Sequence, residues 1–372
     1  MTTTTTETTG ASATPPRKDI DTFKSKVLQA ILGCQAIQTA YLGNKLGWYA
    51  ALAEQGPLTS VQLAATTATD ERYAREWLEM QSMAGWITCE TAAASPKERL
   101  YSLDPAAAHV LTNPNSMDYM MPTATVAAGF GQNLPQLLEA YKTGKGVSWA
   151  ALGLDARRGA MEGTKYYFLN HLGPQLEEHI PALKDMQETG GRIADLGMGS
   201  GFSSIGMAQH FTKCTVDAYD LDEVSVLDAT ENVAAAGLQD RVQAHCVNAG
   251  DVKGDHYNLV IALQCIHDMA DPIGALQAMR ELAGNGQGVV VIADPKTQEN
   301  FTGKPGDLAE QMCYGFSCMC CLPNSMDGEN AAGTGTVMRP STVRMFAQQA
   351  GYKEIEKVPV DHPFWCFYKL IV

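Results

Sequence analysis

The chain has 372 residues, of which 45% are hydrophobic, and its formal net charge is -14 at pH 7. This length suits two or three domains with a sizeable core, and no apolar run approaches the roughly 20 residues that a membrane-spanning helix needs. The acidic balance disfavours nucleic-acid partners because it repels phosphates, and ten cysteines without a disulfide pattern favour a reducing compartment, so we expect a cytoplasmic protein.

The first 17 residues form a polar, threonine-rich segment without the apolar core of a signal peptide. We expect a disordered tail there, because such a composition cannot bury enough apolar surface to fold. The start of an organelle transit sequence is the alternative, although the segment is short and contains the acidic Glu7.

Residues 18–119 are predicted to form a winged-helix domain, in which helices precede a short hairpin. Thr59 and Gln62 form a capping box at the start of one helix, since each side chain can satisfy a backbone donor of the other residue. The predicted helices span about residues 21–48, with an interruption at Gly43-Asn44, and residues 48–56, 60–66 and 70–83. The predicted strands span residues 85–90 and 99–103.

The last helix of this domain would be the recognition helix if the domain bound DNA. It carries Glu71, Glu76 and Glu79 against only two arginines. Since these glutamates repel a phosphate backbone, we expect no nucleic-acid partner.

Residues 120–185 are expected to be a mainly helical linker. Its last part is dense in aromatic and polar side chains, a combination typical of ligand pockets, although packing in the core explains the aromatic residues equally well. The candidates for substrate contact there are Tyr166, Tyr167, Asn170 and His171.

A predicted strand containing Asp195 is followed by three alternating glycines and a helix-like segment. Gly197, Gly199 and Gly201 let a ligand lie against bare backbone at the carboxyl end of a parallel strand. Phe202 stands where a dinucleotide fingerprint needs a small residue, and no Gly-Lys-Ser/Thr follows for a phosphate loop. Both of those nucleotide-binding classes are therefore disfavoured.

This glycine turn resembles motif I of the class I S-adenosylmethionine (SAM)-dependent methyltransferases. The next predicted strand ends in Asp220, 23 positions after Gly197. The resemblance implies that a carboxylate there accepts hydrogen bonds from both ribose hydroxyls of the cofactor. Asp222 is the alternative, because several acidic residues cluster at this strand end.

Later strands carry the other cofactor contacts that the resemblance implies. Asn248 stands where many relatives have an aspartate, and its amide could meet the adenine amino group. Asp251 is the alternative for that contact. The full set of cofactor candidates is Asp195, Gly197, Gly199, Gly201, Asp220, Leu221, Asn248, Ala249 and Gln264.

His267 and Asp268 follow the predicted fourth strand, residues 257–264. In the O-methyltransferases built on a winged-helix N-terminal domain, a histidine at this place is the general base, and the resemblance implies that role for His267. A hydroxyl acceptor must lose its proton as the methyl arrives, and an imidazole suits that transfer. A helix-cap or core histidine is the other interpretation.

An insertion over residues 295–339 follows the predicted fifth strand. It contains four thiols within nine residues, but no second half of a metal-binding pattern, so we expect an apolar helix and no metal. A thiol-lined pocket for trivalent arsenic is the alternative. Insertions at this place line the acceptor site in the resembled fold, which makes Tyr314 and Met319 substrate candidates. The four thiols are those of Cys313, Cys318, Cys320 and Cys321.

These features predict an α/β protein. Residues 186–372 should form a Rossmann-like seven-stranded methyltransferase sheet that ends in an antiparallel hairpin, after the mostly helical winged-helix domain. The resemblance implies a homodimeric enzyme without a membrane partner, which moves a methyl group from SAM to a small-molecule hydroxyl and releases S-adenosyl-L-homocysteine. A thioether or thiol acceptor, such as a methylthio-hydroxy acid, is one alternative, and a non-catalytic SAM-binding transcriptional regulator is another.

Overall fold

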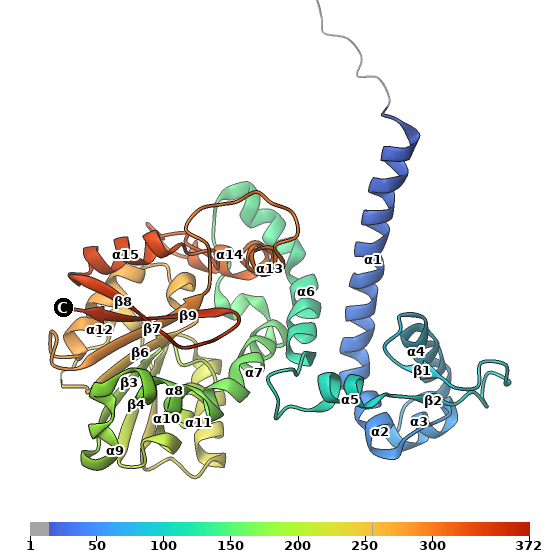
Figure 1. Cartoon of the computed structure of the whole chain (residues 1–372), viewed down its shortest axis with the longest axis horizontal. Helices are drawn as coiled ribbons and strands as arrows, with labels where there is room; N and C mark the ends of the chain where they lie inside the picture. Colours follow the sequence, from blue (N-terminus) through green and yellow to red (C-terminus); the bar gives the residue numbers. More distant parts are fainter. Residues whose placement is uncertain (1–14, 255) are drawn as a thin grey trace, which may run out of the picture. The chain divides into compact units, whose positions relative to one another are not determined.

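The computed structural model describes residues 15–254 and 256–372. It falls into two compact units, of which the first ends at Ala108 and the second spans His109–Val372 (Figure 1). The domain boundaries expected from the sequence stay predictions, and most of the expected disordered tail lies outside the described residues.

The first unit contains the winged helix that the sequence predicts. The capping box is confirmed, because Thr59 accepts from the backbone N–H of Gln62 and the Gln62 side chain accepts from the backbone of Thr59. The elements of this unit in the described residues are α1 (Arg17–Lys45), α2 (Trp48–Gln55), α3 (Ser60–Thr67), α4 (Glu71–Met83), β1 (Thr88–Cys89) and β2 (Tyr101–Ser102).

Trp77 of α4 lies at the centre of this unit. Its ring centroid is 4.9 Å from that of Trp48 and 5.0 Å from that of Tyr49, and its indole N–H donates to the Thr39 carbonyl at 2.7 Å. The hydrogen bond fixes α1 to the winged helix. The sequence predicts a helix to about Trp48 that is interrupted at Gly43-Asn44, whereas α1 continues through these residues to Lys45 and a left-handed turn at Gly47 separates it from α2.

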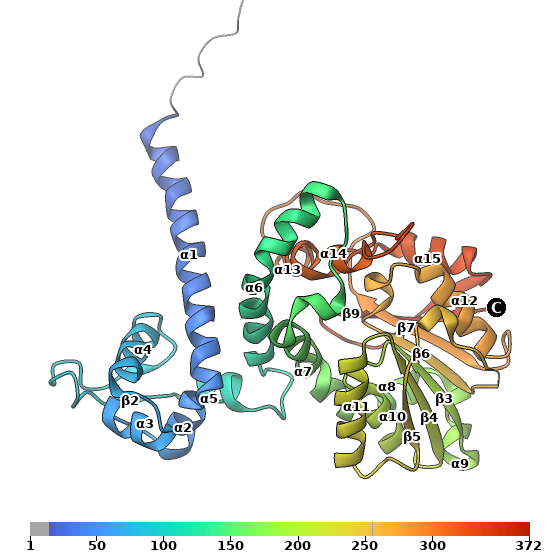
Figure 2. The same cartoon turned by 180° about the vertical axis from the view of Figure 1, so that it is seen from behind.

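The second unit is built on a mixed sheet in the order β5-β4-β3-β6-β7-β9-β8 (Figure 2). The first five of these strands are parallel, and β9 and β8 form an antiparallel hairpin at the edge, as expected from the sequence. Within the described residues the strands of this sheet are β3 (Gly191–Leu196), β4 (Cys214–Asp220), β5 (Val242–Cys246), β6 (Leu259–Leu263), β7 (Val289–Pro295), β8 (Glu354–Val358) and β9 (Trp365–Ile371).

The strand order reverses direction between β3 and β6. The chain passes from β3 outward to β4 and β5, and then returns to place β6 on the other edge of β3. Open α/β sheets bind their ligands beyond the carboxyl ends of the strands at such a switch point. The loops after β3 and β6 are therefore where a site is expected.

Helices surround the sheet and form the rest of the second unit (Figures 1 and 2). None of the helices in the described residues has both the length and the apolar character needed to cross a membrane. The helices are α5 (Pro105–Thr112, which contains the boundary between the units), α6 (Met121–Thr143), α7 (Leu154–Asn170), α8 (Leu172–His179), α9 (Asp185–Thr189), α10 (Phe202–His210), α11 (Glu223–Ala235), α12 (Pro272–Leu282), α13 (Leu308–Phe316), α14 (Leu322–Ser325) and α15 (Pro340–Gln349), with the short turns η1 (Trp149–Leu152), η2 (Pro181–Leu183), η3 (Ala249–Asp251), η4 (Ile266–Asp268) and η5 (Ser317–Cys321).

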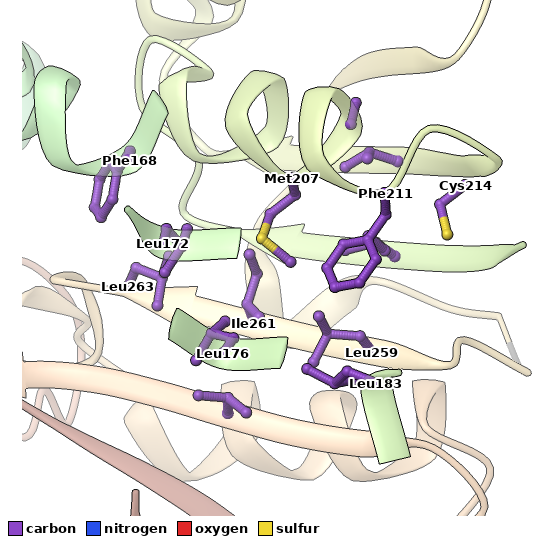
Figure 3. Packing of buried hydrophobic residues seen from close by; sticks show 14 of the residues in the cluster. Phe168, Leu172, Leu176, Leu183, Met207, Phe211, Cys214, Leu259, Ile261 and Leu263 are labelled. Carbon is purple, nitrogen blue, oxygen red and sulfur yellow. The ribbon is translucent and has the colours of Figure 1, made fainter. Parts of the chain in front are cut away.

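Two hydrophobic clusters cover the two faces of this sheet. One joins Ile193 of β3 to Leu172 of α8 and Met207 of α10. Figure 3 shows Leu172 and Met207 of this cluster together with Ile261 of β6, between the helices and the sheet. The other joins Ala194 to α12 and to Phe346 of α15. Successive strand residues point to opposite faces, so β3 is buried on both sides and is fixed in place.

Helix α7 packs closely against α10, the helix that follows the glycine turn. At Gly206 of α10 there is no space for a side chain, because an added Cβ would overlap the carbonyl oxygen of Phe168 in α7. Backbone cannot move aside as easily as a side chain. The distance between the two helices therefore depends on glycine at this position.

We expect Gly206→Ala to lower the free energy of unfolding by about 1–3 kcal/mol, the usual cost of overpacking a core. The matched control is Gly131→Ala in α6, where an added Cβ meets nothing within 4 Å. Alanine there should leave stability unchanged or raise it by roughly 0.5–1 kcal/mol through helix propensity. Urea unfolding of both variants measures the difference, and equal stability would contradict the close α7–α10 contact.

Candidate active site

The turn after β3 has a backbone that glycine adopts without strain. The φ angles of Gly197, Gly199 and Gly201 are 74°, 56° and 77°, in the left-handed region. The backbone N–H groups of Gly197 and Met198 donate to the Tyr219 carbonyl at 2.8 and 3.1 Å, which attaches the turn to β4. The turn presents bare backbone at the carboxyl end of β3.

This turn touches the loop that follows β6. A Cβ added to Gly197 would lie 2.7 Å from the sulfur of Cys265, and the Cys265 thiol donates to the Leu196 carbonyl at 3.3 Å. The loops after β3 and β6 are therefore in contact. A ligand seated on the turn would lie close to the side chains that follow β6.

Asp195 is buried beside the turn with half of its carboxylate unsatisfied. Ser203 and Ser204 each donate to Oδ2 at 2.6 Å, whereas Oδ1 has no hydrogen-bond partner. Burial raises the pKa of Asp195 to about 6, although the two hydroxyls oppose the rise. A buried acceptor without a partner is costly, and an ammonium group of a ligand would remove that cost.

Asp220 ends β4 and faces the same turn. One of its oxygens accepts from the Gly199 N–H and the other from the Asp222 N–H, both at 2.9 Å. Burial raises the pKa of Asp220, and these hydrogen bonds oppose the rise. Each oxygen keeps acceptor capacity for a ligand hydroxyl.

Asp222, the alternative to Asp220, is engaged in structural contacts. Its carboxylate pairs with the buried Arg157 of α7 and accepts from the N–H and hydroxyl of Ser225 at 2.8 and 2.7 Å. It caps α11 and fixes α7 to the sheet. This leaves Asp220 as the better candidate for ligand contact.

The candidates for contact with adenine follow the carboxyl ends of β4 and β5. Leu221 is 72% exposed beside Asp220. The Asn248 amide donates to Asp251 at 3.2 Å, so the two alternatives for the adenine contact are hydrogen-bonded to each other. Ala249 between them is buried.

Gln264 follows β6 with a φ of 58°, which residues with a side chain rarely adopt. Its backbone N–H donates to the Ala293 carbonyl at 2.7 Å, and its side-chain amide donates to the same oxygen at 3.3 Å. Backbone in such regions clusters at functional sites. The turn leads the chain directly to His267.

His267 lies in η4 and is 3% exposed. Its Nδ1 is 2.5 Å from Oδ1 of Asp294, near the end of β7, and its Nε2 is 3.4 Å from Oδ1 of Asp268. Asp294 thus accepts the Nδ1 proton and fixes the orientation of the ring. Nε2 is the nitrogen left for a ligand.

Charge at this cluster favours the protonated imidazole. Burial lowers the pKa of His267, but the charge of Asp268 and the hydrogen bond to Asp294 outweigh it and hold the pKa well above 6.5. Burial raises the pKa of Asp268 and of Asp294, against the effect of His267. The two carboxylates would therefore stabilise the imidazolium that forms when the ring takes up a proton.

The substrate candidates of α7 lie among packed aromatic residues. Tyr167 is buried and its hydroxyl donates to Gln175 at 2.6 Å, and the His171 ring centroid is 6.0 Å from that of Tyr167. The exposed Asn170 donates to the Tyr166 carbonyl at 2.8 Å. These contacts show how the four side chains pack within the protein. Their roles in substrate binding stay predictions.

The substrate candidates of the insertion lie on different elements. Tyr314 of α13 is 37% exposed and accepts from Arg339 at 3.0 Å, while Met319 packs partly buried against the cluster that includes Phe130 of α6. The cysteine segment is helical as expected, but η5 is a π-helical turn. Its thiols therefore do not follow α-helical spacing.

Three residues near the site are not identified by the sequence patterns. Met161 of α7 lies against the glycine turn, since a Cβ on Gly199 would be 3.1 Å from its methyl carbon. Asp294 carries a visible signal, because it is acidic and ends a strand beside β6. Cys321 belongs to the thiol cluster seen in the sequence, but its position beside His267 carries no sequence signal, because only the folded insertion brings the two together.

Comparisons with known proteins agree with this geometry. A family model described as a methyltransferase domain matches residues 194–289, from β3 to the start of β7. A second, described as an Rv2258c-like winged HTH domain, matches residues 34–113. The expectation that the winged helix binds no nucleic acid stays a prediction.

One curated relative is the ribosomal protein uL3 glutamine methyltransferase of Bradyrhizobium diazoefficiens. It is 33% identical over 99 residues, and the match covers 25% of this chain and 31% of that protein. The similarity therefore concerns about a quarter of this chain and less than a third of that protein.

Several solved structures share the fold over nearly the whole chain. The mitomycin 7-O-methyltransferase MmcR has a TM-score of 0.69 at 16% identity, covering 96% of this chain and all of the other. Human N-acetylserotonin methyltransferase in complex with SAM has a TM-score of 0.68 at 15% identity, covering 97% and 99%. PigF with SAH has a TM-score of 0.65 at 13% identity, covering 94% and 99%.

The sheet order, the glycine turn and the acidic strand end define a class I methyltransferase fold. The chain contains a SAM-dependent methyltransferase domain preceded by an Rv2258c-like winged helix.

We expect Asp220→Asn to weaken SAM binding about 10- to 100-fold, because an amide cannot accept two hydroxyl protons and a hydrogen bond to a charged group contributes roughly 1.5–3 kcal/mol. Isothermal titration measures the affinity. Asp240→Asn, at an exposed position, is the matched control and should bind SAM normally. Undiminished binding by the Asp220 variant would remove the ribose contact from Asp220.

Proposed function

We propose that the protein transfers the methyl group of SAM to the hydroxyl of a small molecule, with His267 as the general base. The observation that carries this proposal is the contact between the two loops. The turn for the cofactor touches Cys265, two residues before an imidazole that Asp294 orients. Methyl donor and base would then meet at one place.

The residues present fit SAM. When bound, SAM supplies a methyl group on a positively charged sulfur. Gly197, Gly199 and Gly201 allow the cofactor to approach the backbone, and Asp220 accepts its ribose hydroxyls. Oδ1 of Asp195, which has no hydrogen-bond partner, would accept a hydrogen bond from the ammonium group of SAM.

The adenine would lie between Leu221 and the η3 turn. Leu221 offers an exposed apolar face, while Asn248 or Asp251 offers a polar group to the amino nitrogen. Ala249 and Gln264 line the neighbouring strand ends. We assign these contacts because the residues follow β4, β5 and β6, whose carboxyl ends lie at the same edge of the sheet.

His267 has the means to remove a proton. With Nδ1–H donated to Asp294, the ring in its neutral form has its lone pair on Nε2. When Nε2 takes the proton of the acceptor hydroxyl, the charges of Asp294 and Asp268 stabilise the imidazolium. The reaction otherwise requires acceptor oxygen, methyl carbon and sulfur in line, which is catalysis by orientation.

The number of protons released when SAM binds tests whether the ammonium group of SAM lies beside Asp195. Its pKa of about 6 means that roughly half of the side chains are protonated at pH 6. A ligand ammonium lowers that pKa, so SAM binding at pH 6 should release a fraction of a proton, and at pH 8 none from this group. Calorimetry in two buffers of different ionisation enthalpy measures the release.

The control for that measurement is Asp195→Asn, which cannot release the proton. If wild type and this variant exchange the same number of protons at pH 6, the ammonium does not lie beside Asp195.

The acceptor class is tested with His267→Ala. A screen of small hydroxyl, thiol and thioether compounds, monitored by release of S-adenosylhomocysteine, first identifies an acceptor. For a hydroxyl, loss of the base should lower kcat/KM by about 100-fold or more. A thioether has no proton to lose, so activity on it should be largely spared.

SAM affinity of the His267 variant must stay normal for this comparison to report on the base. Full activity of the variant on a hydroxyl acceptor would contradict general-base catalysis by His267.

We also propose that the protein is a homodimer joined through α1. Phe23, Leu28, Ile31 and Leu32 are 68%, 56%, 49% and 51% exposed on this helix. Apolar side chains gathered in this way mark interaction surfaces. Light scattering should give twice the 40.0 kDa of one chain, and Leu28→Glu should halve that mass. A wild-type monomer would refute the proposal.

A further inference from the structure

Three side chains with different ligand atoms converge beside the sheet. Nε2 or Nδ1 of His267, a carboxylate oxygen of Asp268 and Sγ of Cys321 all lie within 4.8 Å of one another. Nε2 and the Asp268 oxygen are 3.4 Å apart. No other group of three such side chains is found in residues 15–254 and 256–372.

The sulfur is held in position by the backbone of the insertion. Cys321 ends the π-helical turn η5, and such turns are rare and often occur at functional sites. The Gly335 N–H donates to the His267 carbonyl at 3.1 Å, and the Asn324 amide donates to the Asp268 carbonyl at 3.3 Å. The insertion is thus hydrogen-bonded to the backbone of both His267 and Asp268. These bonds hold the Cys321 thiol in place beside the two side chains.

Each of the two carboxylates at this cluster has one oxygen atom without a hydrogen-bond donor. Oδ1 of Asp268 and Oδ2 of Asp294 are buried and lack a hydrogen-bond partner. The imidazole of His267 and the thiol of Cys321 are side-chain groups that interact with these two carboxylates. Buried oxygens in this condition are stabilised by a cation.

The imidazole already has the environment of a metal ligand. Asp294 accepts its Nδ1–H at 2.5 Å and leaves Nε2 3.4 Å from Oδ1 of Asp268. A carboxylate behind a ligating histidine fixes its tautomer and makes it a better ligand. One sulfur, one nitrogen and one oxygen form a three-ligand donor set that suits Zn²⁺, because zinc sites with three protein ligands take water or substrate as the fourth ligand.

We propose that His267, Asp268 and Cys321 bind one borderline-soft divalent cation of the Zn²⁺ class, with Asp294 orienting the imidazole. Binding replaces the thiol proton of Cys321 and, when the imidazole is protonated, its Nε2 proton, and both protons leave to solvent. The metal takes up the sulfur and nitrogen electron pairs, and no electron is transferred.

The site has a functional consequence. A nitrogen that holds a metal cannot also accept a proton, so the metal competes with base catalysis by His267. This consequence rests on the proposed function, whereas the binding of the metal does not.

The test uses the full-length chain after removal of metal by a chelator and dialysis. Titration with Co²⁺ should give absorption bands of tetrahedral cobalt together with a thiolate-to-cobalt charge-transfer band, saturating at one Co²⁺ per chain. One equivalent of Zn²⁺ should abolish the bands. No bands, or bands that grow past one equivalent without saturating, would overturn the proposal.

Two serine variants identify the sulfur. Cys321→Ser should lose the charge-transfer band and bind Co²⁺ at least tenfold more weakly. Cys318→Ser, three residues earlier at an exposed thiol, is the matched control and should behave as wild type. Loss of the band in the control with retention in Cys321→Ser would refute the site.

Asp294→Asn tests the site by Co²⁺ affinity without changing a cysteine. It should keep the charge-transfer band and weaken Co²⁺ binding about 10- to 100-fold. Unchanged affinity would show that His267 is not a ligand. Because each result is spectroscopic, failure of the methyltransferase assay leaves it unaffected, and failure of metal binding leaves the proposed methyl transfer standing.

Discussion

The contact between the glycine turn and the loop after β6 determines the rest of the site. With no side chain at Gly197, the Cys265 sulfur approaches the turn and its thiol donates to the Leu196 carbonyl. That contact sets the distance from the backbone that would hold the cofactor to the imidazole of His267. Because β3 and β6 are buried strands that pair with each other, the distance is fixed by the sheet itself.

Much of the fold could be predicted from local patterns. The capping box of Thr59, the glycine turn and the acidic end of β4 are short-range signals, and short apolar runs located the buried strands. The break between α1 and α2 was expected at Gly43-Asn44, whereas it lies at Gly47, because both glycines are compatible with a break and the local pattern does not distinguish them. The π-helical turn was also missed, since no residue type signals one extra residue per turn.

The candidate site could be predicted where its residues share the carboxyl edge of the sheet. Asp195, Asp220 and His267 follow strands, and parallel strands bring their ends together. Asp294 follows the same rule and was overlooked. Cys321 could not be found in this way, because its approach to His267 depends on hydrogen bonds between the insertion and the backbone of η4.

The π-helical turn makes the geometry of the insertion sensitive to chain length. Such a turn contains one more residue than an α-helical turn, so deletion of a single residue between Ser317 and Cys321 would restore regular winding and rotate the Cys321 sulfur by about 100° around the helix axis. Relatives that differ by one residue here would then present another side chain to the imidazole, with no change in the sheet. A single-codon insertion or deletion would thus be enough to change which side chain stands beside the imidazole of His267.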